Sequence, residues 1–543
     1  MITPVHNPRA EDLRTMLESV RNQAFGDFEH CIVDDGSTAS HVAPMLQAAA
    51  AGDARVRVHV RTEQGGIVAA TNDALEMAQG EFLAFVDHDD ALHVDALAEV
   101  DRVIGEDVDY VYTDEDKIDA NGRHCEPFLK PDWSPERLRT QMYTCHLSVA
   151  RRTLVDDIGR LRIGLDGAQD WDLMLRVTER ARRILHVPRI LYHWRAVPTS
   201  VAGDIDAKPW AYEAGQRAVA DHLERTGVQA EVEQLRGRPG SFRLRPCLRD
   251  EPLVSIVIPT GGFRREVYGD NVNLVVNTVR SIRERSTYQN LEFVVVVDEG
   301  VTPDTRDELM QWDARLVPFA RPFSFSQKIN VGAIHAWGEY LLFLNDDVEV
   351  LPEDWRDTWP RLEGTSAWIE SMLLYALDQG VGAVGAKMYF GDTRLQHVGL
   401  VCTGPGPSHV FRGFGRDFPG YFNNALLPGN YLALTGACLL TRRDAFEAVG
   451  GLCPQLPINF NDVDYCFKLH RAGYRNVFTP DAELLHFESS SRKAHVLEPE
   501  FNFLWRRWRP LLEHDPYYNP QFVPGPHFIV PTYLGSGVFA STG

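Results

Sequence analysis

An apolar strand that ends in acidic residues occurs twice in this sequence. Residues 80–90 read GEFLAFVDHDD and residues 338–347 read GEYLLFLNDD, so a short buried strand is predicted at each place. Open α/β sheets bind ligands outside the carboxyl ends of their strands. Carboxylates crowded there repel one another unless a cation lies between them, and hard divalent cations prefer oxygen ligands. Each stretch therefore indicates a site for a metal and a diphosphate, with a solvated acidic turn as the alternative.

The segments around these two stretches repeat as well. Residues 28–38, FEHCIVDDGST, and residues 291–300, LEFVVVVDEG, are predicted strands that again end in acids. Asn72 precedes Asp87 by the same 15 positions that separate Asn330 from Asn345. Unrelated segments rarely share such spacing, so the two halves are interpreted as one duplicated fold.

A second acidic motif lies further along each half. Residues 167–177, GAQDWDLMLRV, and residues 458–469, INFNDVDYCFKL, each start an amphipathic helix with two aspartates. A strand follows in both halves and ends in LYHWR, with His193, or in LLHFESSSR, with His486. His193 lies 23 positions after Asp170, and His486 lies 24 positions after Asp462.

A chain of 543 residues is too long for one hydrophobic core. We expect domain one at residues 1–240, a Gly-, Pro- and Arg-rich linker at 241–251, domain two at 252–520 and a tail at 521–543. Domain one starts with an apparently truncated strand, because only three residues precede Pro4, whereas a full apolar strand precedes Pro259. Residues 503–520, FLWRRWRPLLEHDPYYNP, predict an aromatic and basic helix that caps domain two, with membrane contact as the alternative.

The composition excludes several classes of protein. The formal net charge is −21, which argues against a nucleic-acid partner. The eight cysteines form no CxxC pair, so neither a cysteine zinc site nor a disulfide framework is indicated. The sequence has no apolar run of about 18 residues and no leader pattern. A cytoplasmic location is expected, with peripheral contact at the inner face of the membrane as the alternative.

In these motifs and in their order, the chain resembles the family 2 glycosyltransferases. It is most similar to the tandem two-domain, rhamnosyltransferase-like proteins of bacterial surface-polysaccharide (O-antigen) synthesis. The resemblance implies an α/β fold of two glycosyltransferase type A domains, each a mostly parallel sheet flanked by helices. It also implies inverting, metal-dependent transfer of a hexosyl or deoxyhexosyl group. The donor would be a nucleotide-diphosphate sugar, the cofactor Mn or Mg, and the acceptor a growing surface glycan or a lipid-linked glycan.

The resemblance also assigns roles to individual residues. The general bases would be Asp170 and Asp462. The donor-binding residues would be Pro4, Asp34, Asp35 and Asp87 in the first half, and Pro259, Asp298, Glu299 and Asn345 in the second. The metal ligands would be Asp89 and His193 in the first half, and Asp347 and His486 in the second.

These roles suit the chemistry of inversion, which needs a base on one side of the anomeric carbon and an electrophile on the leaving diphosphate. Each assignment has a structural alternative, because aspartate is common at helix starts and a histidine at a strand end is often only hydrogen bonded. Three functions stay open: an enzyme active in both halves, an enzyme with one degenerate half, and a non-catalytic glycan-binding scaffold protein.

Overall fold

A computed structural model describes residues 1–196, 209–352, 365–404, 406–487, 496–535 and 538–539. The contacts within the chain define two compact units. Unit 1 comprises Met1–Leu244, Asn519–Val523 and the segment from Ile529 onward, and unit 2 comprises Arg245–Tyr518 and Pro524–Phe528. Residues 488–492, the end of the second histidine motif, lie outside the described residues.

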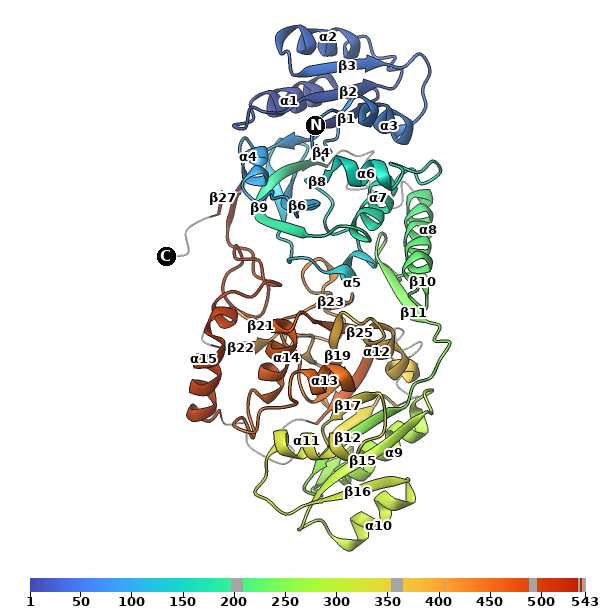
Figure 1. The fold of residues 1–543 in the computed structure, drawn as a ribbon, viewed down its shortest axis with the longest axis vertical. Coiled ribbons are helices and arrows are strands. Elements are labelled where there is room, and N and C mark those ends of the chain that lie inside the picture. Colours follow the sequence, from blue (N-terminus) through green and yellow to red (C-terminus); the bar gives the residue numbers. More distant parts are fainter. Residues whose placement is uncertain (197–208, 353–364, 405, 488–495, 536–537, 540–543) are drawn as a thin grey trace. The chain divides into compact units, whose positions relative to one another are not determined.

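Unit 1 contains the following elements in chain order (Figure 1): β1 (Ile2–Val5), α1 (Ala10–Arg21), β2 (His30–Asp34), α2 (Val42–Gly52), β3 (Val56–Val60), α3 (Ile67–Met77), β4 (Phe82–Ala84), β5 (Ala91–Leu92), α4 (Ala96–Asp101), β6 (Tyr110–Ile118), β7 (His124–Phe128), α5 (Pro135–Leu138), β8 (Ser148–Arg151), α6 (Arg152–Asp157), α7 (Gln169–Thr178), β9 (Ile184–Arg195), α8 (Pro209–Thr226), β10 (Ala230–Gln234), β11 (Phe242–Pro246), β26 (Tyr533–Gly535) and β27 (Val538–Phe539).

Unit 2 contains β12 (Val254–Thr260), β13 (Arg264–Val267), β14 (Asp270–Asn273), α9 (Leu274–Arg285), β15 (Leu291–Asp298), α10 (Pro303–Gln311), β16 (Ala314–Phe319), α11 (Phe325–His335), β17 (Tyr340–Leu344), β18 (Val348–Val350), η2 (Thr365–Ala367), α12 (Trp368–Ala376), β19 (Val381–Tyr389), β20 (Leu395–His397), β21 (Leu400–Cys402), β22 (Pro407–His409), η3 (Tyr421–Asn423), β23 (Gly429–Asn430), β24 (Cys438–Arg442), α13 (Arg443–Ala448), α14 (Asn461–Arg471), β25 (Arg475–His486) and α15 (Glu498–Glu513).

The strand order confirms the predicted duplication. The main sheet of unit 2 runs β16-β15-β12-β17-β24-β19-β25-β18. Unit 1 has the sheets β1-β2-β3 and β4-β8-β6-β9-β5, and a parallel bridge between Ile2 and Phe85 links β1 to the chain just after β4. When this bridge is counted as a link between the two sheets, the strand order of unit 1 is β3-β2-β1-β4-β8-β6-β9-β5. This is the strand order of unit 2. The first strands, β1 of four residues and β12 of seven, occupy equivalent places.

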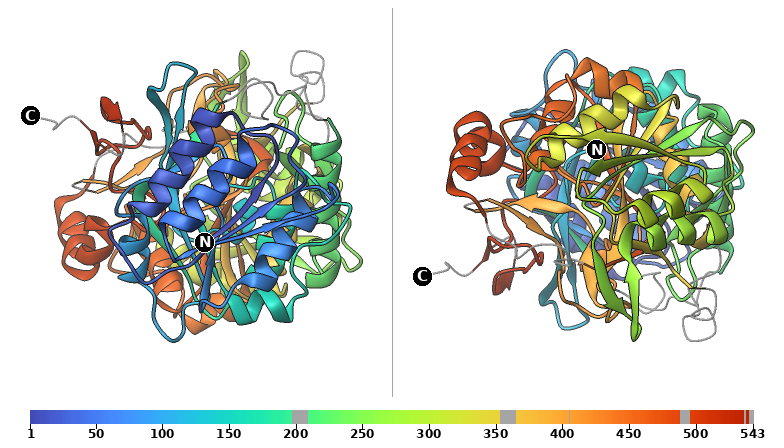
Figure 2. Two further views of the ribbon diagram at one scale, coloured as in Figure 1. Left: turned by 90° about the horizontal axis from the view of Figure 1, so that it is seen from above. Right: turned by 90° about the horizontal axis from the view of Figure 1, so that it is seen from below.

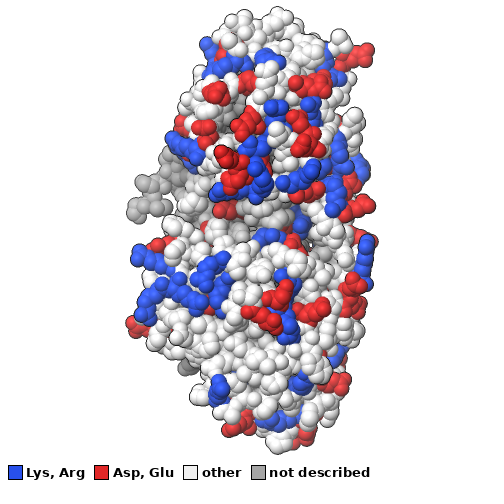
Figure 3. Space-filling view, viewed as in Figure 1, with Lys and Arg blue, Asp and Glu red and all other residues white. Residues whose placement is uncertain are grey.

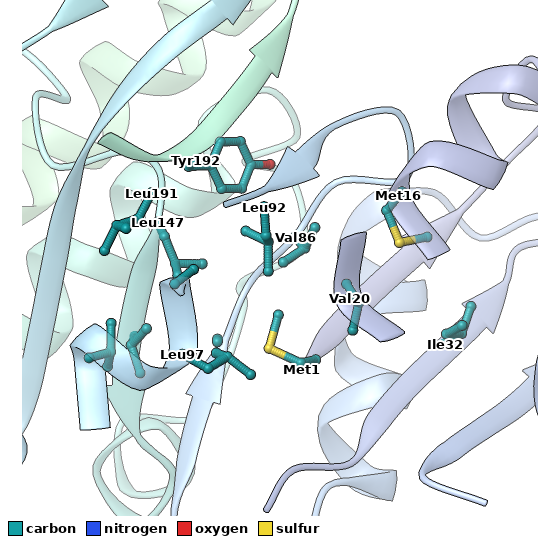
Figure 4. Packing of buried hydrophobic residues seen from close by; sticks show 14 of the residues in the cluster. Met1, Met16, Val20, Ile32, Val86, Leu92, Leu97, Leu147, Leu191 and Tyr192 are labelled. Atoms are coloured by element: carbon teal, nitrogen blue, oxygen red, sulfur yellow. The ribbon is translucent and has the colours of Figure 1, made fainter. Parts of the chain in front are cut away.

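Runs of apolar residues in the sequence explain why the inner strands of the sheet are buried. Every residue of β12 is buried, and so is nearly all of β15, as expected for parallel strands with helices on both faces. In unit 1, α1 turns Leu13, Met16 and Val20 into the core, and Leu17 beside them is half-buried. Figure 4 shows Met16 and Val20 near Met1 in this packing. The helices α1 and α2 lie side by side over the first sheet (Figure 2).

The predicted cap of domain two is confirmed by α15. Its residues Leu504, Trp508 and Leu512 are buried, and the Trp508 indole Nε1 donates to Asp464 Oδ1 at 2.7 Å. Exposed arginines lie on the other side of the helix, and Figure 3 shows Lys and Arg side chains gathered there. No helix among the described residues has both the length and the apolar character needed to cross a membrane.

Candidate functional site

Unit 2 holds a cavity of about 530 Å³ at the carboxyl ends of its parallel strands. Strands β12, β15 and β17 end there, α14 begins there, and β25 ends there. The predicted site residues that line this cavity are Pro259, Asp298, Asn345, Asp347, Asp462 and His486. Glu299 is exposed and lies outside the lining. Six of the predicted residues of the second half are therefore brought together.

The predicted metal ligands of this cavity lie at the end of β17 and the end of β25. His486 Nε2 lies 3.1 Å from Asp347 Oδ1 and 3.1 Å from Asn345 Nδ2. The other ring nitrogen, Nδ1, lies 2.6 Å from the amide oxygen of Gln396. A hydrogen bond from Nδ1–H to this oxygen leaves a lone pair on Nε2, which is how a second residue orients a histidine ligand. Asp347 and His486 thus present an oxygen and a nitrogen at one place.

The predicted base, Asp462, lies in the first turn of α14. Asp462 Oδ2 accepts a hydrogen bond from the Gly436 backbone amide at 2.8 Å, and Oδ1 accepts one from its neighbour Val463 at 2.8 Å. Desolvation by burial raises the pKa of Asp462 above its ordinary value of 3.8. A carboxylate with a raised pKa is a stronger base than an ordinary aspartate.

Lys328 is a site residue that sequence reasoning missed. Its ammonium lies 2.7 Å from Asp298 Oδ1 and donates to the Thr260 carbonyl oxygen at 2.8 Å, and its side chain is fully buried. Desolvation lowers the pKa of Lys328, and Asp298 opposes that shift. The only sequence signal is a lysine on the buried side of α11. Lys328 fixes the position of the Asp298 carboxylate at the end of β15.

Unit 1 has a smaller cavity, of about 80 Å³, at the equivalent strand ends. Pro4, Asp87 and Asp170 line it, so the structure also brings these three predicted residues together. Desolvation by burial raises the pKa of Asp87 and of Asp170 above the ordinary value of 3.8. Unit 1 therefore places a strand-end carboxylate and the candidate base on one cavity, whereas unit 2 has Asn345 at the position of Asp87.

A histidine, His146, lines the cavity of unit 1. Arg151 pairs with Phe82, and Arg442 pairs with Tyr340, which makes His146 the counterpart of Ala437. The His146 ring stacks on Tyr192 with centroids 4.6 Å apart, and its Nδ1 lies 3.2 Å from Glu115 Oε2. Hydrogen bonds and the negative charge of Glu115 outweigh desolvation and raise the pKa of His146 well above 6.5. An imidazole ring thus lies where unit 2 has a methyl group.

The remaining predicted residues of this part of unit 1, the donor residues Asp34 and Asp35 and the metal ligand Asp89, have structural partners. Asp35 accepts hydrogen bonds from the backbone amides of Gly65 and Gly66, each at 2.8 Å, and so fixes the start of α3. Asp34 Oδ1 accepts from the Ser37 amide at 3.0 Å. The backbone oxygen of Asp89 accepts from Arg195 Nε at 2.7 Å. These three residues lie outside the lining of the cavity.

The structure does not place His193 and His486 at equivalent positions. In unit 2, His486 pairs with Val348, the residue directly after Asp347. In unit 1, His193 pairs with Ala91, and the same register places Trp194 opposite Asp90. A shift of one residue in a strand turns the side chain to the other face of the sheet. Trp194 is therefore the counterpart of His486, and His193 contacts Asp116 instead, with 2.6 Å between Nδ1 and Oδ1.

Two asparagine clamps hold the site in the same way in both units. The Asn72 side chain donates to the Leu161 carbonyl at 3.0 Å and accepts from the Leu161 amide at 3.1 Å. The Asn330 side chain makes the same two bonds to Leu452, at 2.8 and 2.9 Å. Each clamp joins the helix before the acidic strand to the loop that leads toward the helix of the predicted base.

A family model and two similar proteins characterise the family to which the sequence is related. A family model described as "Glycosyl transferase family 2" matches residues 1–158 and 255–450. The y4gI protein of Sinorhizobium fredii (strain NBRC 101917 / NGR234) is 40% identical over 541 residues, covering 96% of this chain and 57% of the relative. The O-antigen biosynthesis protein RfbC of Myxococcus xanthus is 36% identical over 533 residues, covering 96% of this chain and 40% of the relative. The chain thus spans about half the length of these relatives.

Among solved structures, one similar chain is S. aureus TarS 1–349 in complex with UDP. It is 24% identical, with a TM-score of 0.33, over 41% of this chain and 64% of that chain.

Proposed function

The chain belongs to glycosyl transferase family 2, and from that premise we propose that unit 2 transfers a hexosyl or deoxyhexosyl group, with inversion, from a nucleotide-diphosphate sugar to a glycan or lipid-linked acceptor. The observation that carries the proposal is that Asp462, Asp347 and His486 line one cavity large enough for a ligand. The name of the Myxococcus xanthus relative supports a role in surface-polysaccharide synthesis.

The residues of this cavity fit a divalent cation. Asp347 Oδ1 and His486 Nε2 are 3.1 Å apart, and the Gln396 amide oxygen orients the histidine. We expect Mn or Mg to be held by these two side chains, with Asn345 beside them. When bound, the cation supplies positive charge that stabilises the leaving nucleoside diphosphate.

The residues of the chain perform the remaining steps. Asp462 accepts the proton of the acceptor hydroxyl, whose oxygen forms the new bond to the anomeric carbon as the bond to the diphosphate oxygen breaks. Attack from the face opposite the diphosphate inverts the anomeric configuration. Asp298, held by Lys328, and Pro259 would border the nucleoside at the neighbouring strand ends.

A test uses the full chain with a panel of nucleotide sugars and a glycan acceptor, in Mg or Mn. We expect release of nucleoside diphosphate that depends on metal and is lost in Asp347→Ala. Turnover that is insensitive to chelation and to this substitution would contradict the proposal. Binding of nucleotide sugar without turnover under any condition would favour the scaffold function.

A second transferase site in unit 1 is favoured by one observation: Asp87 and Asp170 line a common cavity. Its metal side differs, because Trp194 stands at the position of His486. We propose Asp170 as the base and Asp87 as a donor contact there, with Asp89 as the candidate metal ligand.

A further inference from the structure

Unit 1 contains a cluster of two histidines and one aspartate that the proposed transfer reaction does not use. Asp116 comes from β6, His124 from β7 and His193 from β9. His193 Nδ1 lies 2.6 Å from Asp116 Oδ1, and His124 Nδ1 lies 2.8 Å from Asp116 Oδ2. One potential ligand atom from each residue lies within 4.8 Å of the other two. Three strands therefore bring three ligand groups to one point.

The cluster faces away from the cavity of unit 1. Tyr192 and Trp194 on β9 both contact the His146 ring, which lines that cavity. Successive side chains of a strand point to opposite faces of the sheet, so His193, between these two residues, points to the other face. The cluster is thus a separate place from the strand ends that carry Asp87 and Asp89.

We propose that Asp116, His124 and His193 form a binding site for a zinc-class divalent transition-metal ion. Imidazole nitrogen suits Zn and its neighbours in the first transition row, whereas Mg and Ca prefer oxygen ligands alone. Two nitrogens and one carboxylate are a common set of three protein ligands for Zn, with water in the fourth position. The two imidazole rings meet edge to face, with centroids 4.5 Å apart, so both converge on the Asp116 carboxylate.

Charge supports the same assignment. The Asp116 side chain is 0% exposed, and its carboxylate lies between the two imidazoles. Removing a carboxylate from water costs several kcal/mol unless positive charge compensates it. Each imidazole can give a nitrogen lone pair to a metal only after releasing the proton of that nitrogen, so binding should weaken as the pH falls.

The duplication supplies an internal comparison. Ala150 pairs with Tyr110 and its counterpart Thr441 pairs with Ala383, so Asp116 on β6 matches Tyr389 on β19. Asp116 pairs with His193 and Tyr389 pairs with Leu485, so His193 matches Leu485. A leucine cannot bind a metal. The ligand set therefore belongs to unit 1 and differs from the acidic strand ends that both units share.

Zinc binding to the full chain tests the proposal. Every chain carries Asp347→Ala, which removes a competing ligand in unit 2, and excess Mg occupies the remaining acidic groups. The variants are His124→Gln and His193→Gln, and the matched control is His59→Gln, an exposed histidine on β3. Zn is titrated by calorimetry into protein that has been stripped of transition metals and contains only Mg, and Co is titrated while the visible absorption of tetrahedral Co is recorded.

We expect one Zn per chain in the parent and in His59→Gln, and at least about tenfold weaker binding in both variants, with loss of the Co spectrum. Failure of the parent to bind Zn would overturn the proposal, and so would a Zn affinity in both variants equal to that of the parent. If His193→Gln does not fold by circular dichroism, His124→Gln decides, because that side chain is 20% exposed. These readouts involve no sugar transfer, so this proposal can fail independently of the proposed function.

Discussion

Asp462 is the single residue on which the proposed chemistry depends most. Loss of a positioned base typically costs about 10²- to 10⁴-fold in rate, and we expect Asp462→Asn to fall in this range for the metal-dependent turnover. Donor affinity should stay nearly unchanged, because the base contacts the acceptor hydroxyl. Steady-state rates and calorimetric titration of the nucleotide measure the two quantities. Asp304→Asn, an exposed aspartate on α10, is the control, and a loss below about fivefold in Asp462→Asn would exclude the role.

The raised pKa of Asp462 predicts a pH dependence with a definite sign. The ionised carboxylate is the active form, so the rate should fall as the pH decreases through a pKa that lies above 3.8. A raised pKa in the folded state favours the protonated form, so the stability that this group contributes at low pH is lost as the pH rises through that pKa. At neutral pH, Asp462→Asn should therefore melt no lower than the parent. A clearly lower melting temperature would show that the carboxylate is mainly structural.

The cavities of the two units differ at one aligned position, where unit 1 has His146 and unit 2 has Ala437. Ala437→His should close the cavity of unit 2 and weaken nucleotide binding there at least about tenfold, a loss of about 1.4 kcal/mol. His146→Ala should strengthen binding in unit 1. Calorimetry with a panel of nucleoside diphosphates measures both, with Ala437→Ser as the control of similar size. Unchanged affinity in Ala437→His would mean that this position does not face the ligand.

Among individual residues, the sequence predicts the acidic site residues better than the residues that contact them. Asp87, Asp347 and Asp462 are visible because they follow apolar strands or begin a helix. Lys328 is not, because a lysine in a helix is normally a solvated surface residue, and only the fold shows that it is buried beside Asp298. His146 is likewise visible only once the pairing of β8 with β4 aligns it with Ala437.

Among the contacts between elements, we expect the asparagine clamps to contribute measurably to the free energy of unfolding. Asn330→Ala leaves the Leu452 amide and carbonyl without their side-chain partner, and an unsatisfied buried group costs about 1–3 kcal/mol. Asn72→Ala should cost a similar amount in unit 1. Chemical denaturation of each variant measures the loss, and Gln311→Ala, exposed at the end of α10, serves as the control. A loss no larger than in this control would show that solvent replaces both bonds.

Periodicity and spacing predict where the elements lie, yet they leave strand register open. The apolar runs of β12 and β15 were readable from the sequence. The distances of 23 and 24 positions that suggested a match between His193 and His486 differ by one residue, which is enough to reverse the direction of a strand side chain. Only the pairing of β9 with β5 shows which face His193 occupies.

For the whole molecule, two separate main sheets predict two independent nucleotide sites. Titration of the full chain with nucleoside diphosphate and Mn should resolve two components, and Asp347→Ala should remove only the component of unit 2. Sites on different cores are expected to act additively. Loss of both components in this variant would show that the sites are coupled, and a single component in the parent would identify unit 1 as degenerate.

The duplication itself was predictable, because each acidic motif recurs in the same order in the second half. The repeated strand order and the match to glycosyl transferase family 2 confirm the predicted type A fold. The donor sugar and the acceptor have no comparable signal, since they depend on the volume and polarity of a cavity built from residues far apart in sequence, such as Phe263, Thr435 and Ile458.

The clamps of Asn72 and Asn330 also bear on how such a chain can change over generations. Each clamp fixes the helix before the acidic strand relative to the segment that leads to the base. It does so through backbone groups that any residue except proline would supply at position 161 or 452. Substitutions at ligand-facing positions, such as 146 and 437, can therefore alter what a unit accepts while the spacing of its reactive groups is inherited intact. A duplicated gene with this frame can acquire a new sugar preference in one copy while the other copy keeps the old one.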